Sequence, residues 1–234
     1  MTTQMARADG SGAMFDQIAK RYDLLNRLMS FGMDRGWRKQ LIESMPSDGE
    51  LLDVATGTAD VGLALARVHP QTTVVGLDPS QGMLDVGHTK IKSRKLGDRV
   101  TLVLGDAQAM DFETDRFSGC TIAFGIRNVP DRVKGLQEMA RVVKPGGVVS
   151  ILELSEPKGG LMSFMARLHV HHIVPMMGWI LSGKKEYRYL QKSIAAFPPA
   201  DDFAKMMTNA GLTDIKVIRL TFGVAHLYIG RVAG

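Results

Sequence analysis

Four aspartates follow short apolar runs whose composition is typical of strands. Asp53 and Asp60 belong to the segment LLDVATGTADVG (51–62), Asp78 ends the next apolar run, and Asp106 follows the third. The carboxyl ends of parallel strands meet at one edge of an open sheet, where such sheets bind their ligands. Each aspartate alone fits a turn or a helix cap. Four of them at consecutive strand ends favour a binding site.

The turn inside this segment restricts the ligand. A pyrophosphate-binding turn reads Gly-x-Gly-x-x-Gly, whereas the matching positions here are Ala55, Gly57 and Asp60, and no Gly-Lys-Ser/Thr follows as in a P-loop. A carboxylate at the last position would repel phosphate. S-adenosylmethionine carries an ammonium and a sulfonium group and no phosphate, so Asp53 and Asp60 would balance or hydrogen-bond its amino-acid end.

The other two aspartates suit the rest of the same cofactor. Asp78 lies about 20 residues beyond the glycine turn, where an acidic side chain binds ribose hydroxyls. Asp106 is placed to accept a hydrogen bond from an adenine amino group, and Met83 and Met110 would add apolar contact. The sequence therefore predicts S-adenosylmethionine as the cofactor.

The elements that would position these residues alternate between strands and helices, as in a parallel sheet covered on both faces. The first five strands are expected in sequence order, and IKVIRL and VAHLYIGRV would add a closing antiparallel hairpin after them. The expected strands span 50–55, 73–78, 100–104, 119–125, 148–154, 215–220 and 224–232. KPGG (144–147) is expected to be the turn that ends a helix and begins the fifth strand.

The chain has the length of one domain, expected over 14–234 after a loose tail of residues 1–13. Two helices, over 14–30 and 34–45, precede the first strand and form a helical cap over 14–45. A mainly helical lid insertion is expected over 158–210. Additions of this kind usually cover a ligand site.

Composition excludes several classes of protein. The single cysteine, Cys120, cannot form an intrachain disulfide, and the first residues lack the apolar core of a signal peptide, which favours the cytoplasm. The net charge of +5 would suit nucleic acid or an anionic surface. The densest basic run, residues 89–99 with Lys90 and Lys92, is interpreted instead as a solvated helix face.

The segment FGIRNVPDR (124–132) should face the group that is methylated, because it follows the fourth strand. Methylases of exocyclic amines commonly carry Asn-Pro-Pro-aromatic here, and that pattern is absent. Arg127 and Asn128 offer hydrogen-bond donors instead, which suits ring oxygens, and a guanidinium near a phenol lowers its pKa. Asp131 is interpreted as the cap of the next helix. Glu153 and Ser155 are expected to support the site from behind.

At these residues the sequence resembles the ubiquinone and menaquinone biosynthesis C-methyltransferases. The resemblance runs from about Met14 to the end of the chain. Its most specific segments span 22–37, 124–131, 141–155 and 187–198. The chain departs from the family at three positions, with Leu25 in place of Met, Asp34 in place of His and Ala59 in place of Gly. The aromatic residues that the family tends to carry around HVHHIVP are also missing, so the substrate wall is expected to differ.

The resemblance implies a class I S-adenosylmethionine-dependent methyltransferase fold, an α/β Rossmann-like, mostly parallel seven-stranded sheet with helical lid insertions. It implies C-methylation of a polyprenylated hydroquinone, with demethylmenaquinol as the expected substrate and a methoxy polyprenyl benzoquinol as the alternative. Arg127 and Asn128 would be catalytic. The cofactor site would add Gly57, Thr58 and Ala107 to the aspartates, and the substrate site would hold Tyr22, Asn26, Tyr187 and Tyr189.

The general base stays open between His226, the triplet His169, His171 and His172, and a water held by Arg127. The triplet lacks nearby cysteine or carboxylate ligands, so no metal is expected. Other readings also remain: a methyltransferase of soluble phenols or polyketides, a nucleic-acid methylase suggested only by charge, and a silent cofactor-binding scaffold.

The apolar stretch 161–181 is broken by Arg167, three histidines and Pro175, so it is not expected to span a membrane. It is interpreted either as a plain helical lid or as a methionine-rich cover that meets the prenyl tail and the inner face of the cytoplasmic membrane. The expected partners are the quinol substrate and this membrane surface, without nucleic acid. A homodimer is left open.

Overall fold

The computed structural model describes residue 16, residue 19, residue 30, residues 32–156 and residues 184–234, the first five residues of the last range by their backbone only. The predicted tail 1–13, most of the predicted helix 14–30 and the stretch 161–181 lie outside the described residues. So do Tyr22, Asn26 and the histidine triplet.

The described chain forms a seven-stranded sheet in the order β3-β2-β1-β4-β5-β7-β6. Strands β1 to β5 pair in parallel, and β7 runs antiparallel between β5 and β6. The strands are β1 (Asp48–Val54), β2 (Gln71–Asp78), β3 (Val100–Leu104), β4 (Phe117–Ala123), β5 (Val143–Leu154), β6 (Leu212–Leu220) and β7 (Ala225–Val232). This confirms the predicted mostly parallel sheet with an antiparallel hairpin.

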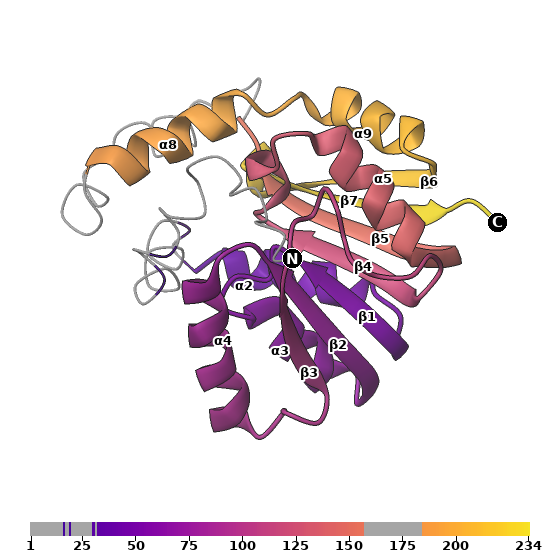
Figure 1. Ribbon diagram of the computed structural model, residues 1–234. Coiled ribbons are helices and arrows are strands. Elements are labelled where there is room, and N and C mark those ends of the chain that lie inside the picture. Colours follow the sequence, from indigo (N-terminus) through magenta and orange to yellow (C-terminus); the bar gives the residue numbers. More distant parts are fainter. Residues whose placement is uncertain (1–15, 17–18, 20–29, 31, 157–183) are drawn as a thin grey trace, which may run out of the picture.

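Helices cover both faces of the sheet (Figure 1). One face carries α2 (Asp34–Glu43), α3 (Asp60–Val68) and α4 (Gln81–Arg94), and the other carries α5 (Arg132–Val142) and α9 (Ala200–Asn209). Helix α8 (Lys184–Ala195) reaches away from the sheet. The short turn η1 (Ile126–Asn128) lies against α8.

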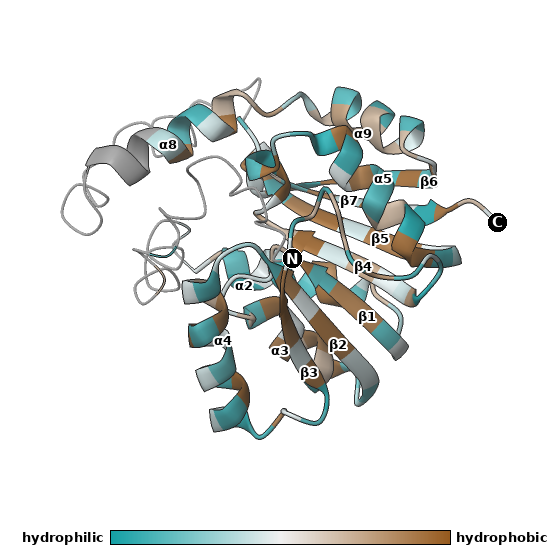
Figure 2. Ribbon diagram, in the orientation of Figure 1, coloured by the Kyte–Doolittle hydropathy of each residue, from teal (hydrophilic) through white to brown (hydrophobic). Residues whose placement is uncertain are grey.

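Hydrophobic residues concentrate in the strands of the sheet (Figure 2). The central strand β1 is buried along its last four residues, which explains why it reads as an apolar run. Phe203 and Met207 anchor α9 to the sheet in the same cluster as Leu136 of α5. Within the predicted insertion 158–210, α9 is therefore part of the layer that covers the sheet.

The boundaries differ from the sequence prediction where the backbone is irregular. Strand β4 ends at Ala123 because Phe124 adopts a φ of +60°, which leaves the extended conformation. The predicted turn KPGG instead lies inside β5, between the pairs Phe117↔Val143 and Gly119↔Val148. The hairpin turn is confirmed as η3 (Thr221–Gly223).

Candidate functional site

A cleft that is open to solvent lies at the carboxyl ends of the parallel strands. It is bordered by the segments that follow β1, β2, β3 and β4. The strand order reverses between β1 and β4, which is the place where such sheets bind ligands. Its walls include the predicted residues Gly57, Asp78, Asp106, Ala107 and Asn128.

The turn after β1 has a backbone of alternating handedness. Ala55, Gly57 and Ala59 all have positive φ values, of 49°, 56° and 65°. Such a conformation is easy for glycine and strained for other residues. Gly125 lets the turn after β4 approach closely, because a Cβ atom there would lie 2.6 Å from that of Ala55.

The Asp53 carboxylate accepts hydrogen bonds from residues on both sides of this turn. Its side chain, 1% exposed, accepts hydrogen bonds from Thr56 Oγ1 (2.6 Å), Thr121 Oγ1 (2.9 Å) and the N–H of Gly62 (3.1 Å). Burial raises the pKa of the Asp53 carboxyl, and these hydrogen bonds oppose the shift. Both carboxylate oxygens thus serve the chain itself, so the structure gives Asp53 a supporting place behind the turn.

Asp78 joins two strand ends. One carboxylate oxygen accepts from the N–H of Gly57 at 2.8 Å, and the other accepts from the N–H of Ser80 at 2.9 Å. The side chain lies on the cleft wall although the residue is only 6% exposed. Desolvation raises the pKa of Asp78 to about 6. Each oxygen keeps a second lone pair that can accept from a ligand hydroxyl.

Asp106 lies across the cleft. Its Oδ1 accepts from the N–H of Gln108 at 2.9 Å, and the Gln108 side-chain amide lies 3.1 Å from both carboxylate oxygens. Ala107 lies beside it on the wall, and so does Met83, whereas Met110 belongs to the hydrophobic core. The structure thus brings Asp78, Asp106 and Met83 together as predicted, with Gln108 holding the Asp106 carboxylate.

The charge of Asp60 is compensated within the chain. Lys90 Nζ lies 2.7 Å from Asp60 Oδ1 and 2.7 Å from Thr58 Oγ1. The interpretation of Lys90 as part of a solvated helix face is therefore wrong, while Lys92 is exposed as expected. Lys90 is drawn inward because the carboxylate that begins α3 lies within its reach.

Arg38 was missed by the sequence analysis. It lines a smaller cavity beside the turn, which is open to solvent, together with Asp53, Gly57, Thr58 and Asp60. The guanidinium carbon lies 5.5 Å from the centre of the Phe124 ring, and Nε lies 3.6 Å from Asp34 Oδ2. This buried Nε makes no hydrogen bond within the described residues. A basic residue on an amphipathic helix is ordinary, so no sequence signal distinguished it.

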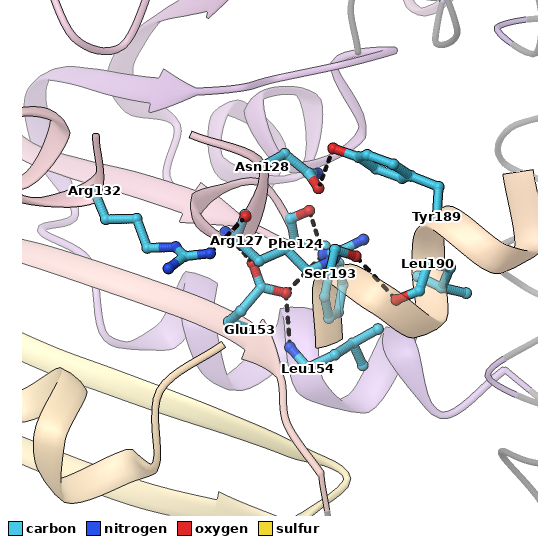
Figure 3. A network of polar contacts seen from close by, with 9 residues as sticks. All are labelled: Phe124, Arg127, Asn128, Arg132, Glu153, Leu154, Tyr189, Leu190 and Ser193. Carbon is cyan, nitrogen blue, oxygen red and sulfur yellow. Dashed lines mark hydrogen bonds and ion pairs between the residues drawn. The ribbon is translucent and has the colours of Figure 1, made fainter. Parts of the chain in front are cut away.

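The side chain of Arg127 forms polar contacts with Glu153 and Phe124 (Figure 3). Its Nη1 donates to Glu153 Oε1 at 2.7 Å and to the carbonyl oxygen of Phe124 at 2.5 Å, and its backbone N–H donates to Glu153 Oε2 at 3.1 Å. Arg127 is 9% exposed and Glu153 is fully buried. The charge expected to face a phenol is therefore paired with a carboxylate behind the turn.

Asn128 does lie on the cleft wall. Tyr189, from α8, donates a hydrogen bond of 3.2 Å to Asn128 Oδ1 (Figure 3). Burial raises the pKa of the Tyr189 hydroxyl, and the charges of Arg127 and Arg132 oppose the shift. With its oxygen engaged in this way, the amide offers its NH2 group to a ligand. Tyr187 lies in α8, but its side chain is outside the described residues.

The remaining predicted residues lie at the start of α5 and on or beside β5 and β7. Asp131 caps α5 as predicted, accepting from the N–H of Lys134 at 3.0 Å. His226 of β7 lies opposite Glu153, and its Nδ1 is 2.7 Å from Ser155 Oγ. Burial lowers the pKa of the His226 ring, which favours the neutral form.

Neither a metal site nor a membrane span emerges from the residues that the structure describes. Histidine, cysteine, aspartate and glutamate side chains form no group of three able to hold a metal there. The same part of the chain holds no helix long and apolar enough to cross a membrane.

Comparison with known proteins identifies the family of the chain. Residues 3–231 match the model of the ubiE/COQ5 methyltransferase family. A ubiquinone/menaquinone biosynthesis C-methyltransferase UbiE from Geobacter sulfurreducens is 42% identical, over 93% of this chain and 86% of that relative. A demethylmenaquinone methyltransferase from Bacteroides fragilis is 37% identical, over 92% of this chain and 89% of that relative.

Solved structures share the fold at low identity. An S-adenosylmethionine-dependent methyltransferase from Aquifex aeolicus is similar with a TM-score of 0.65 at 14% identity, over 93% of this chain and 98% of that one. A phosphoethanolamine N-methyltransferase from Haemonchus contortus in complex with S-adenosylmethionine has a TM-score of 0.69 at 14% identity, over 94% of this chain and 60% of that one. The [4+2]-cyclase SpnF has a TM-score of 0.70 at 16% identity, over 95% of both chains. These similarities confirm the predicted fold class.

Proposed function

The chain belongs to the ubiE/COQ5 methyltransferase family, and from this premise we propose that it methylates a ring carbon of a polyprenylated hydroquinone with S-adenosylmethionine as the donor. The proposed reaction converts a demethylmenaquinol to a menaquinol. It forms a carbon–carbon bond, breaks the carbon–sulfur bond of the donor and releases a proton. The relative from Bacteroides fragilis is named for this reaction.

The single observation that carries the proposal is the charge of the cleft. Asp78 and Asp106 supply carboxylates to its walls, and none of the described residues that line it is basic. Such walls disfavour the phosphates of a dinucleotide and accept a ligand rich in hydroxyl and amino donors. When bound, S-adenosylmethionine supplies an electrophilic methyl group on a cationic sulfur.

The residues present fit that cofactor at both ends. Asp78 has lone pairs for the ribose hydroxyls, and Asp106 has them for the adenine amino group. The methionine end carries a carboxylate as well as an ammonium group, and Arg38 lines the smaller cavity beside the glycine turn with its Nε free of hydrogen bonds to described residues. We therefore add Arg38 to the proposed cofactor site, as the group that receives the carboxylate.

For the quinol, we propose that Asn128 holds a ring oxygen through its NH2 group. Tyr189 fixes the orientation of the amide by donating to Oδ1. Holding the ring in this way aligns the carbon beside that oxygen with the incoming methyl group, and alignment of two bound reactants supplies much of the rate of a displacement.

A benzoquinol of the ubiquinone pathway is the second candidate substrate. The name of the relative from Geobacter sulfurreducens includes both the ubiquinone and the menaquinone pathway, and this observation favours the benzoquinol as a second candidate. Both substrates present a ring oxygen beside an unsubstituted carbon, so the two share the proposed contact with Asn128.

The proposal is tested with purified protein, S-adenosylmethionine and reduced short-chain quinols. Mass spectrometry should find demethylmenaquinol converted to a product heavier by one methyl group, in parallel with formation of S-adenosylhomocysteine. Asp78→Ala should remove this activity by removing cofactor binding. Methylation of a soluble phenol or polyketide, with neither quinol accepted, would contradict the proposed substrate class.

We also propose that the protein works in the cytoplasm at the inner face of the membrane, where prenylated quinols reside. This proposal is supported only by the sequence of the stretch 161–181, which is apolar and rich in methionine. Flotation with vesicles that contain a prenylated quinone at low salt should bring the protein to the lipid fraction. Protein that stays at the bottom of the gradient contradicts the membrane contact. A homodimer and the absence of nucleic-acid binding stay predictions.

A further inference from the structure

Glu153 is a fully enclosed carboxylate behind η1. It is the penultimate residue of β5 and is fully buried, and its carboxylate accepts three hydrogen bonds. Two come from Arg127, through Nη1 at 2.7 Å and the backbone N–H at 3.1 Å, and the third comes from the N–H of Leu154 at 2.8 Å. One carboxylate thus binds both the side chain and the backbone of the residue before Asn128.

Other contacts close the same turn. Asn128 N–H donates to the carbonyl oxygen of Gly125 at 3.0 Å, and Arg132 Nη2 donates to the carbonyl oxygen of Arg127 at 3.2 Å. Arg127 Nη1 also binds the carbonyl oxygen of Phe124, whose φ of +60° is strained for a residue with a side chain. The turn therefore holds an unfavourable backbone conformation that its partners must maintain.

We infer that Glu153 is a positioning residue: it holds Arg127 and the backbone of η1 so that the amide of Asn128 faces the substrate, and Arg127 works as its counterion behind the turn. This inference rests on the proposed function. It assigns contact with the quinol to Asn128.

The burial of this pair supports a role in geometry. Taking two charges out of water costs free energy that their attraction often only offsets, and apolar residues of similar volume commonly replace such pairs without loss of stability. A carboxylate that binds a guanidinium and two backbone N–H groups fixes direction as well as distance, which apolar residues cannot do.

The test compares Glu153→Gln with Arg127→Met/Glu153→Met. Glutamine offers one acceptor oxygen in place of two, so its NH2 group would face a donor on one side. That donor would be either the backbone N–H of Arg127, which now binds Oε2, or the Arg127 Nη1 and Leu154 N–H groups, which now bind Oε1. We expect the dissociation constant of S-adenosylmethionine to stay within about threefold, while kcat falls roughly 10- to 100-fold, as expected for a misplaced reactant. The paired variant removes both charges and should fold even if the single variant does not. Its kcat should also remain low.

The matched control is Glu50→Gln. Glu50 also forms a close pair with an arginine, at 2.8 Å from Arg116, but at the start of β1, the opposite end of the sheet from the cleft. Its kcat should be that of the unmodified protein. If the paired Met variant regains that kcat as well, the Arg127–Glu153 pair positions nothing and the inference is wrong.

Asn128→Ala provides a further comparison. If Glu153 acts through Asn128, adding Glu153→Gln to Asn128→Ala should slow the reaction no further, whereas losses that multiply would contradict the inference. A crystal structure of Glu153→Gln needs no turnover and should show the Asn128 amide displaced. Failure of the unmodified protein to methylate any quinol would instead count against the proposed function, and this structure would still decide the position of Asn128.

Discussion

Asp78 links cofactor binding to pH, because its carboxylate is buried and lies on the cleft wall. Its pKa in the ligand-free protein is about 6, above the ordinary value of 3.8. A ligand that donates hydrogen bonds to a carboxylate favours the ionised form. The affinity for S-adenosylmethionine should therefore fall as pH falls below about 6, by up to about tenfold per pH unit. Calorimetry between pH 5 and 8 checks this.

Asp78→Asn is the control, because its weaker affinity should not show this dependence on pH. An affinity of the unmodified protein that stays constant down to pH 5 would contradict the assignment. For the free energy of unfolding the sign is opposite. The contribution of Asp78 is complete below pH 3.8 and is lost as pH rises through about 6, because the folded state holds the proton more tightly.

Arg38 should recognise the carboxylate of the cofactor. A hydrogen bond to a charged group contributes about 1.5–3 kcal/mol, so Arg38→Gln should weaken S-adenosylmethionine binding roughly 10- to 100-fold. Decarboxylated S-adenosylmethionine should bind the variant and the unmodified protein equally. The control is Lys39→Gln, because Lys39 is the next residue of the chain and its side chain is exposed. This substitution should leave both affinities unchanged. Equal losses for both ligands would show that Arg38 supports the cavity in another way.

The sequence predicted the site best where the signal was local. Asp78 and Asp106 end apolar runs, so their common position at the sheet edge follows from strand alternation. The partners of Asp60 and Arg127 are Lys90 and Glu153, which lie 30 and 26 residues away along the chain. Such pairing depends on how α4 and β5 pack, and residue types at a strand end do not reveal it.

At the scale of elements, the helix caps differ in quality. Ser80 caps α4 by accepting from the N–H of Met83 at 3.2 Å. At the other end of α4, Lys95 takes a left-handed φ of 56°. This conformation costs a residue with a side chain roughly 1–2 kcal/mol, and glycine avoids the cost.

Lys95→Gly should therefore raise the free energy of unfolding by about 1 kcal/mol, equivalent to roughly 2–4 °C in melting temperature. Calorimetry measures the change. Arg94→Gly, inside the last turn of the same helix, should instead lower stability by about 1 kcal/mol, because glycine is a poor helix former. A loss of stability in Lys95→Gly would show that its side chain makes contacts that outweigh the strain.

The same local logic explains which elements could be predicted. The five parallel strands and the closing hairpin appear as apolar or alternating runs, and nearly all of their bounds were predicted within a few residues. The start of β5 was not predicted, because residues 144–147 interrupt the pairing of β5 with β4 and resemble an ordinary turn. The packing of α9 on the sheet was also missed, because Phe203 and Met207 look the same on a lid as on a core helix.

At the scale of the whole molecule, the cleft joins the two halves of the sheet, because it receives residues from both sides of the point where the strand order reverses. A ligand bound there should stabilise the domain as a unit. At 100 times its dissociation constant, S-adenosylmethionine should add about 2.7 kcal/mol. The melting temperature should rise by roughly 5–10 °C.

A nicotinamide dinucleotide at the same concentration should produce no such shift, because the cleft presents carboxylates to its phosphates. Thermal denaturation with each ligand makes the comparison. A shift with the dinucleotide and none with S-adenosylmethionine would contradict the charge argument on which the proposed function rests. The similarity of SpnF, a cyclase, shows that this fold serves other reactions, so the fold does not replace that measurement.

The order of the last strands has a consequence for synthesis on the ribosome. Strand β7 lies between β5 and β6, although β6 precedes it in the chain. As the nascent chain emerges, β6 appears first and has no neighbour to pair with until residues 225–232 follow. Premature termination before that point would leave β5 with an open edge and β6 unpaired, a hazard for aggregation. Translation must therefore pass residue 232 before the sheet can be completed.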